Sequence, residues 1–527
     1  MKNPDDCIKT SSQYPQYGLT KRVTRGGIFT VLNQMTDALR YVFLVPLFLS
    51  AWGSQVYGEW LTISALVAYL SFANAGIHNY VVNSLTQSYS QGDLIKYTKT
   101  LHSALRLYLT ISILVGIIFA IFVFFFPFWN WFNISSVGES EVRLSSFILG
   151  VNLLLSIPAG LILGVYFSVG EYPRQAFLSS ISQIFLIIFL ALALFLKGNF
   201  VVISLVQSIP MVGLLIFAIW DIRHRYPNIN FGFSSANWKL SFSFILPGLI
   251  FSLITIADVI KIQGSILIVN IVIGSIAVTI FSVHRTLANA IFKITSSVSM
   301  SIWPEITSLE SRGDFKKLKR AHNLLVKCSL LLSSSFSIFL FFTGKEIIKI
   351  WTHGKVAFEP VLWFILIAYL PLNCIWQVSS IFQISTNRHK KYSLYRLFSA
   401  IIGLALSWII TKMGGGIVGA YVGFILPEII ICCWFVPMDT LKMTNDSPND
   451  FWLNTVGRSS IIVIAQIFVS LVLVYSISNT IFQWILLAVG ILGTGIFLSY
   501  LFWLDDYEKQ LGMCFVRLIF KKIGIRR

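Results

Sequence analysis

The stretch Asp37-Ala38-Leu39-Arg40 recurs as Asp258-Val259-Ile260-Lys261, a shift of 221 positions, from 37 to 258. The same shift places Gly53-Ser54 on Gly274-Ser275 and Gly92-Asp93 on Gly313-Asp314. A shift of 217 places Pro210 on Pro427 and residues 170–175 on residues 387–392. A nearly constant offset over this length indicates that the chain contains two copies of one structural unit.

The composition indicates that both copies fold in a membrane. Hydrophobic residues make up 56% of the 527 residues and charged residues only 12%, whereas soluble proteins carry about 25% charged residues. The net charge is +18, and in so apolar a chain such an excess is typical of cytoplasmic loops. These figures exclude a soluble enzyme, a nucleic-acid binder and a secreted disulfide scaffold. The six cysteines lack metal-ligand spacing, so no metal and no cofactor is expected.

Fourteen segments have the roughly 20 mostly apolar residues that a membrane-spanning helix needs. They are residues 27–52, 59–83, 103–127, 146–169, 176–196, 200–221, 242–266, 272–302, 322–343, 361–386, 394–412, 416–437, 458–477 and 481–503. The loops between them are too short for a soluble catalytic domain. We therefore do not expect an enzyme.

The repeat and the spans together predict an all-α polytopic membrane protein made of two six-helix bundles and an extra helix pair. Because an even number of spans separates the copies, both bundles have the same orientation, which is a parallel repeat typical of transporters. The expected regions are a basic N-terminus (1–26), the two bundles (27–222 and 240–437), the extra pair (458–503) and a basic tail (504–527).

The basic residues predict the orientation. Most of the 40 Lys and Arg residues fall in segments on the side of the N-terminus. The opposite side holds Arg143, Lys197, Lys345, Lys349, Lys355 and Lys412. By the positive-inside rule, both termini are cytoplasmic.

After the basic residues are sorted to the two sides, four remain, and all four fall inside predicted spans: Arg40, Lys261, Arg285 and Lys293. A charge at the bilayer centre costs about 2.5–3.5 kcal/mol, so such residues normally face a cavity or a partner. On the eighth span, Arg285, Asn289 and Lys293 share one helical face, and His284 lies beside it. This stripe predicts a cationic cavity, which suits an anion such as a phosphate.

The acidic and histidine residues inside spans leave alternatives open. Asp37 and Asp258 each stand three residues before a basic residue, so each pair either neutralises itself or lines the cavity. Arg285 and Lys293 need a counter-charge, which is one of these two aspartates or an anionic ligand. His78 and His284 are proton-relay groups or structural histidines. Glu428, beside Pro427, is a candidate cation or proton site.

Two stretches carry a resemblance to a known family. They are Gly53-Ser54-Gln55-Val56-Tyr57-Gly58-Glu59-Trp60, with Ala75-Gly76 after it, and Phe281-Ser282-Val283-His284-Arg285-Thr286-Leu287-Ala288-Asn289, followed by Ile302-Trp303-Pro304-Glu305. Over roughly residues 20–440 the chain resembles the polysaccharide flippases of the multidrug/oligosaccharidyl-lipid/polysaccharide (MOP) exporter superfamily. Those flippases usually have twelve spans, and the fourteen here are closer to the lipid II flippase, whose extra pair forms a lipid groove.

The resemblance implies a V-shaped pair of bundles that carries undecaprenyl-diphosphate-linked oligosaccharide, such as O-antigen units, across the bacterial inner membrane. It also implies membrane lipids, a polysaccharide polymerase and a chain-length regulator as partners. Arg40 and Arg285 occupy positions that match the family's functional arginines, with Lys261 and Lys293 as weaker candidates.

Two other functions stay open. A cation- or proton-coupled multidrug extruder of the same superfamily has the same architecture, although a cationic centre suits its substrates poorly. A membrane enzyme that acts on lipid-linked glycans needs a large external loop, which this sequence lacks.

Overall fold

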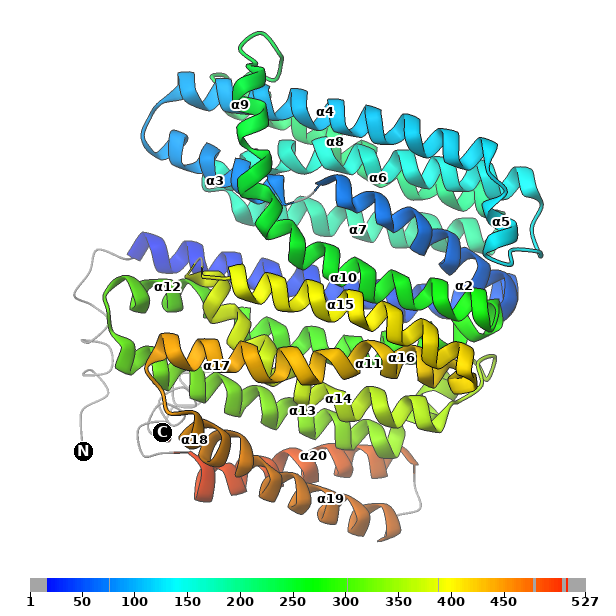
Figure 1. Cartoon of the computed structure of the whole chain (residues 1–527), viewed down its shortest axis with the longest axis vertical. Helices are drawn as coiled ribbons and strands as arrows, with labels where there is room; N and C mark the ends of the chain where they lie inside the picture. Colours follow the sequence, from blue (N-terminus) through cyan, green and yellow to red (C-terminus); the bar gives the residue numbers. More distant parts are fainter. Residues whose placement is uncertain are drawn as a thin grey trace.

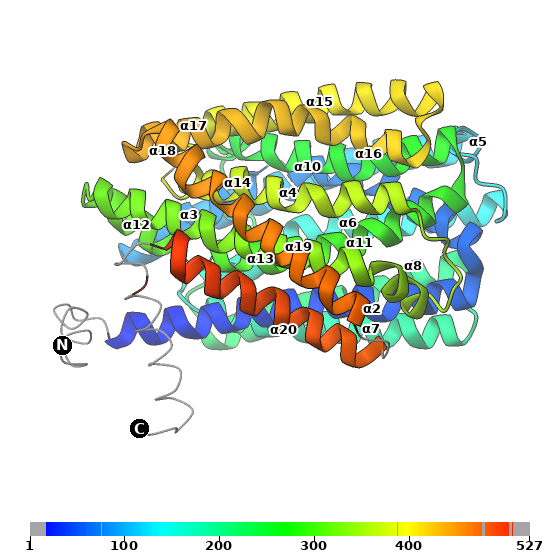
Figure 2. The same cartoon turned by 90° about the horizontal axis from the view of Figure 1, so that it is seen from below.

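The chain folds into helices that run along one common direction, with loops at the two ends (Figures 1 and 2). The computed structural model describes residues 17–504 apart from 75, 301, 387 and 477–479, together with residue 509, and no strand occurs in this part of the chain. The first helix begins and the last helix ends on the same side, at the left in Figure 1. We call this side the terminal end and the opposite side the far end.

Three groups of helices follow one another and lie broadly from top to bottom in Figure 1. The first half contains α2 (Tyr17–Ala68), η1 (Tyr69–Asn74), α3 (Ile77–Ser90), α4 (Leu94–Phe125), α5 (Phe128–Trp131), α6 (Glu139–Ser168), α7 (Tyr172–Phe195) and α8 (Phe200–Arg225). The second half contains α9 (Trp238–Ser243), α10 (Ile245–Val272), α11 (Ser275–Met300), α12 (Trp303–Ser311), α13 (Phe315–Trp351), α14 (Pro360–Ser385), α15 (Lys390–Ile410), η2 (Thr411–Gly415), α16 (Gly416–Pro427), η3 (Glu428–Cys432) and α17 (Cys433–Thr444). The last group contains α18 (Pro448–Asp450), η4 (Phe451–Gly457), α19 (Ser459–Ser476), α20 (Thr480–Leu498) and η5 (Ser499–Trp503). Helix α2 packs against both α7 and α11, so it joins the two halves.

The described residues contain 12 helical segments long and apolar enough to cross a membrane, and two of these segments each fold back on themselves. Within α2, the Phe48 and Trp60 ring centroids are 6.3 Å apart, whereas twelve residues of straight helix span about 18 Å. The reversal occurs at Gly53, whose φ of 72° favours glycine. In the segment Lys390–Thr444 the Ser407 hydroxyl donates to the Ala420 carbonyl (2.9 Å) across a second reversal. The described chain therefore has fourteen crossings, as the sequence predicts.

The repeat is visible in local structure. Gly92 and Gly313 both have positive φ, 72° and 69°. Each precedes an aspartate that caps the next helix: Asp93 accepts from the Lys96 amide (2.8 Å), and Asp314 accepts from the Lys317 amide (3.1 Å). The predicted fold class, two repeated helical bundles plus a helix pair, is confirmed.

One predicted span is wrong in its course. The sequence predicts an unbroken helix over residues 59–83, but the structure has helix from the Gly53 reversal to Asn74 and a new helix, α3, from Ile77. Gly76 between them has φ 64°, which ends a right-handed helix. An apolar stretch that contains one glycine is predicted as one continuous helix, because a glycine inside a helix lowers its stability by only about 1 kcal/mol.

The extra pair is attached to the second half through a buried amide. The Gln466 side chain on α19 donates to the Ser335 hydroxyl (2.8 Å) on α13 and to the Ile491 carbonyl (3.0 Å) on α20. Its outward apolar side chains, such as Ile461, Ile464 and Phe468, are exposed, as lipid contact requires.

Candidate functional site

A central cavity of about 760 Å³ lies where the two halves meet. Helices α2, α7 and α8 of the first half and α10, α11 and α13 of the second half line it, together with Trp484 of α20. The structure brings four sequence-predicted residues to its lining: Arg40, Arg285, Asn289 and Lys293. The remaining polar lining side chains include Gln207, Gln263 and Ser282. Most other lining residues are apolar.

Helix α10 fixes the orientation of Arg285. The Arg285 Nη1 group donates to the Ile262 carbonyl (2.9 Å) and to the Ser265 hydroxyl (2.7 Å). The guanidinium carbon lies 5.0 Å from the centroid of the Phe281 ring. A guanidinium has five N–H donors. The hydrogens of Nη1 are used, and within the described chain no hydrogen bond uses the edge formed by Nε and Nη2. This edge is the one that binds a phosphate with two parallel hydrogen bonds.

Arg40 and Lys293 converge on one aromatic ring although they belong to different halves. Arg40 donates to the Tyr41 hydroxyl (2.9 Å), and its guanidinium carbon is 4.8 Å from the Tyr41 ring centroid. The Lys293 ammonium is 5.3 Å from the same centroid. Tyr41, which also lines the cavity, therefore holds a cation of the first half close to a cation of the second half.

The lining is strongly biased in charge. Three cationic side chains and no carboxylate occur among the described residues that line the cavity. The apolar walls lower the local dielectric and strengthen the field of the three cations. The arrangement can bind an anion that bridges the two halves.

The predicted residues Lys261, Asp258 and Glu428 lie instead in a separate ion cluster inside the second half. Glu428, on η3, pairs with both Lys261 and Arg396, and Arg396 also pairs with Asp258. The Tyr369 hydroxyl donates to Glu428. The four charges cancel, and Glu428 and Arg396 are 2% and 4% exposed. Buried charges require such pairing.

This cluster bears on two questions that the sequence leaves open, namely the role of the Asp258–Lys261 pair and the counter-charge of Arg285. Asp258 pairs with Arg396, and Lys261 pairs with Glu428, on other helices. Within the described chain, these contacts between helices take the place of both alternatives for this pair, a direct Asp258–Lys261 pair and a position in the lining of the central cavity. Asp258 is thereby used, and no carboxylate of the described chain forms an ion pair with Arg285. The side chain of Asp37 lies outside the described residues.

The two histidines lie outside the cavity lining. His284 is fully buried; its Nδ1 lies 2.8 Å from the Ile280 carbonyl, and its Nε2 accepts from the Glu359 amide (3.1 Å). Both ring nitrogens are thus bonded to backbone. His78 lies beside Gly164, where an added Cβ would be 3.4 Å from the histidine Cε1. Neither histidine is placed among the cavity cations.

Sequence reasoning missed two residues. The sorting of basic residues counts Arg396 with those on the side of the N-terminus, but Arg396 is buried on α15, almost two turns inside the helix. The signal is a buried face with small residues at helical spacing, formed by Arg396, Ser399, Gly403 and Ser407. Tyr41 gave no signal because aromatic residues are common in spans. Within the described chain, no group of three potential metal ligands occurs.

No protein-family model and no curated protein matches the sequence. Solved structures do match. The lipid II flippase MurJ in an inward closed conformation has a TM-score of 0.67 at 15% identity, over 90% of this chain and 98% of that one. An inward-facing multidrug resistance MATE family transporter of the MOP superfamily has a TM-score of 0.63 at 13% identity, over 79% and 94%. An outward-facing one has a TM-score of 0.57 at 14% identity, over 81% and 96%. The chain therefore has the fold of MOP-superfamily transporters.

Proposed function

We propose that this protein is a flippase that carries a diphosphate-linked oligosaccharide on a polyprenyl lipid, such as an O-antigen unit on undecaprenyl diphosphate, across the bacterial inner membrane. The observation that carries this proposal is the central cavity, in which cations from both halves face one another and no described lining residue is acidic. A diphosphate carries the negative charge that cationic lining side chains bind, and its oxygens accept charge-assisted hydrogen bonds from them.

Arg285, Arg40 and Lys293 are the proposed diphosphate ligands, and Asn289 is a hydrogen-bonding neighbour. The arginine edge left by α10 binds one phosphate in two parallel bonds. Arg40 and Lys293 bring charge from opposite halves to the same ligand. Because the ligand then contacts both halves, its binding changes the free-energy difference between their arrangements, as alternating access requires.

Hydrogen bonds between α2 and the second half support closure of the route from the cavity toward the far end. The Thr279 hydroxyl donates to the Ser54 carbonyl (2.6 Å), and the Ser54 hydroxyl donates to the Lys355 carbonyl (3.0 Å). The Trp351 indole donates to the Val42 carbonyl (2.9 Å). All three bonds join α2 to the second half. We infer that this state loads from the terminal end, and that the bonds break when the oligosaccharide leaves at the far end.

The positive-inside rule supports a cytoplasmic terminal end, so export proceeds from cytoplasm to the outer face. The proposed partners are membrane lipids, a polysaccharide polymerase and a chain-length regulator, which the resemblance implies.

A second candidate is a multidrug extruder, which the likeness to MATE transporters favours. Extruded drugs are commonly cations, and three cationic lining side chains repel them. Glu428, which could serve as a coupling site, already pairs with Lys261 and Arg396.

Calorimetry on the full-length protein in lipid nanodiscs separates the candidates, with inorganic pyrophosphate and tetraphenylphosphonium as probes. We expect pyrophosphate to bind, and R285A to weaken it about 10- to 150-fold, because hydrogen bonds to charged groups contribute about 1.5–3 kcal/mol. Lys412→Ala, which removes an exposed cation outside the cavity, is the matched control. Binding of tetraphenylphosphonium without pyrophosphate would establish the extruder instead.

A further inference from the structure

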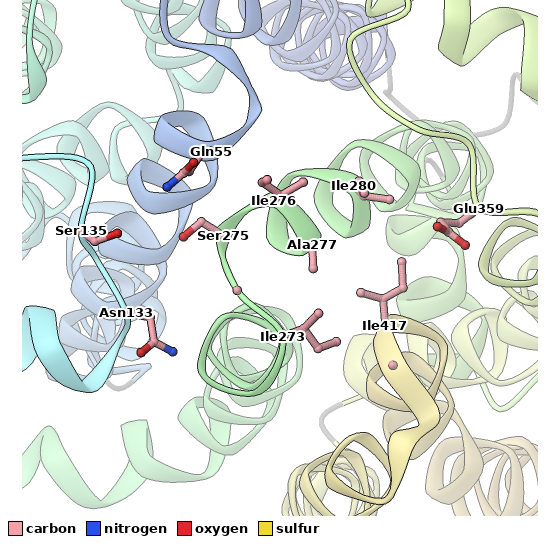
Figure 3. Close-up of a pocket in the computed structure, with 12 residues that line it drawn as sticks. Gln55, Asn133, Ser135, Ile273, Ser275, Ile276, Ala277, Ile280, Glu359 and Ile417 are labelled. Atoms are coloured by element: carbon pink, nitrogen blue, oxygen red, sulfur yellow. The ribbon is translucent and has the colours of Figure 1, made fainter.

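A second cavity, of about 560 Å³, opens at the far end; we call it the outer groove. Its lining comes from loops and helix starts of both halves. The lining residues that matter for the proposal include Gln55, Asn133, Ser135, Ile276, Glu359 and Ile417. In Figure 3, Gln55, Ser135 and Ser275 lie on one side, Glu359 lies on the other side, and Ala277 and Ile417 lie between them.

The outer groove is separate from the central cavity although α11 contributes to both. Ile276, Ala277 and Ile280 face the groove, whereas Arg285 and Lys293 line the central cavity. At 100° per residue, these two sets point to opposite sides of the helix. The charge also differs, because Glu359 is the one ionisable residue in the described groove lining.

Buried side chains hold the polar residues of the groove in place. Glu59, which is fully buried, accepts from the Ser135 amide (3.1 Å) and from the next amide, of Ser136 (3.0 Å). His284, also fully buried, accepts from the Glu359 amide (3.1 Å). Glu59 therefore supports the loop on one side of the groove, and His284 supports the loop on the other side. Such support is expected where the position of side chains matters for binding.

The side chain of Asn133, another polar residue of the groove lining, is also fixed by a hydrogen bond to backbone. The Asn133 side chain donates to the Ile271 carbonyl (3.3 Å) of the second half. By contrast, no hydrogen bond or ion pair is recorded for the side chains of Gln55, Ser135 and Glu359 within the described chain. Ser135 and Glu359 are therefore positioned at the groove through their backbone amides, and within the described chain the side chains of all three residues keep their hydrogen-bonding capacity.

We propose that the outer groove is a second saccharide-binding site, which takes an uncharged or amino-substituted saccharide without its phosphates. Amide and hydroxyl groups match sugar hydroxyls, and the isoleucine floor matches the apolar faces of sugar rings. Glu359 accepts from a hydroxyl or an ammonium and repels phosphate. The choice of a saccharide, rather than another polar ligand, rests on the proposed function.

The site has a consequence for transport. Because its lining comes from both halves, it exists only while the far end is closed. A saccharide that binds there stabilises the closed state by RT ln(1 + [saccharide]/Kd), so the stabilisation grows with the logarithm of concentration once the site is saturated. Saccharide that accumulates outside therefore slows the opening of the far end. The groove acts as a sensor of delivered product.

The test uses the full chain in nanodiscs and two lipid-free probes, maltohexaose and the glucosamine hexamer, followed by saturation-transfer NMR and calorimetry. We expect Q55A to weaken binding about 2- to 10-fold, as loss of one or two hydrogen bonds predicts. E359Q should weaken the binding of the glucosamine hexamer more than the binding of maltohexaose. Gln91→Ala, at an exposed terminal-end position, is the matched control.

R285A separates the two sites. We expect R285A to weaken the binding of pyrophosphate and to leave the binding of both hexamers unchanged. Three results would overturn the proposal of a saccharide site in the outer groove. The wild-type protein binds neither hexamer, or Q55A and E359Q leave hexamer binding unchanged, or R285A abolishes hexamer binding. Failure of pyrophosphate alone to bind would overturn the proposed function and leave the groove standing as a polar-ligand site.

Discussion

Gly58 is the residue whose replacement tests the closed far end most directly. It lies on the second segment of α2, against the start of α11. A Cβ added at Gly58 would lie 1.9 Å from the Ser275 carbonyl oxygen and 2.6 Å from its carbon. The obstacle is backbone, so no side-chain rotation relieves it. We therefore expect Gly58→Ala to force α2 and α11 apart.

The expected size follows from the cost of one extra methyl group in a packed site, which is about 1–3 kcal/mol. In a state in which α2 and α11 have separated, the added methyl group meets no obstacle and has no free-energy cost. The whole penalty therefore destabilises the state with a closed far end. An equilibrium that shifts by about 1–3 kcal/mol changes about 5- to 150-fold. The population with an open far end should rise by this factor.

The measurement is the rate at which a membrane-impermeant maleimide modifies a cysteine at position 279, in a chain without native cysteines. Thr279 is fully buried where α2 meets α11, so modification reports opening. Gly138→Ala is the control, because Gly138 is also at the far end, has φ −63° and has open space around it. If G58A is modified no faster than G138A, the proposal that α2 and α11 separate is refuted.

Three substitutions test other parts of the fold by thermal unfolding in nanodiscs. R396A leaves a buried carboxylate short of a partner and should lower the free energy of unfolding by about 3–5 kcal/mol. The control R388A breaks an exposed ion pair worth about 1 kcal/mol or less. Equal shifts in Tm for the two variants would contradict the buried ion cluster. Gly414→Ala, at φ 94°, should lower Tm because a left-handed residue with a Cβ costs about 1–2 kcal/mol, and Gly213→Ala, in open space within α8, should raise it slightly. Gln466→Leu leaves buried hydrogen-bonding groups unpaired and should cost about 1–3 kcal/mol; an unchanged Tm would show that this amide does not hold the extra pair.

The number of crossings and the duplication were predictable because both depend on properties that a sequence displays. Apolar length determines whether a segment can span a membrane, and the recurrence of Gly92-Asp93 at Gly313-Asp314 marks the same turn and cap in each copy. The stripe on α11 was predictable for a similar reason, since helical spacing alone places Arg285, Asn289 and Lys293 on one face.

Contacts between distant helices were not predictable in this way. Lys261 pairs with Glu428, 167 residues later, and no local pattern shows that η3 packs beside α10. Arg396 was misassigned because a basic residue near a loop counts toward the loop in charge sorting. The orientation of Arg285 depends on the carbonyl of Ile262, a backbone group that sequence analysis does not consider.

Helix α10 links the two sets of buried charges, and this link gives the neutral cluster a role in the cavity. Ile262, whose carbonyl holds Arg285, directly follows Lys261, which the cluster anchors to Glu428. Movement of Lys261 therefore moves the groups that aim the guanidinium. R396A, although outside the cavity lining, should then weaken pyrophosphate binding as well as stability. A cluster that only supports folding would lower Tm and leave the affinity of the folded protein unchanged, so the two measurements on one variant decide between these roles.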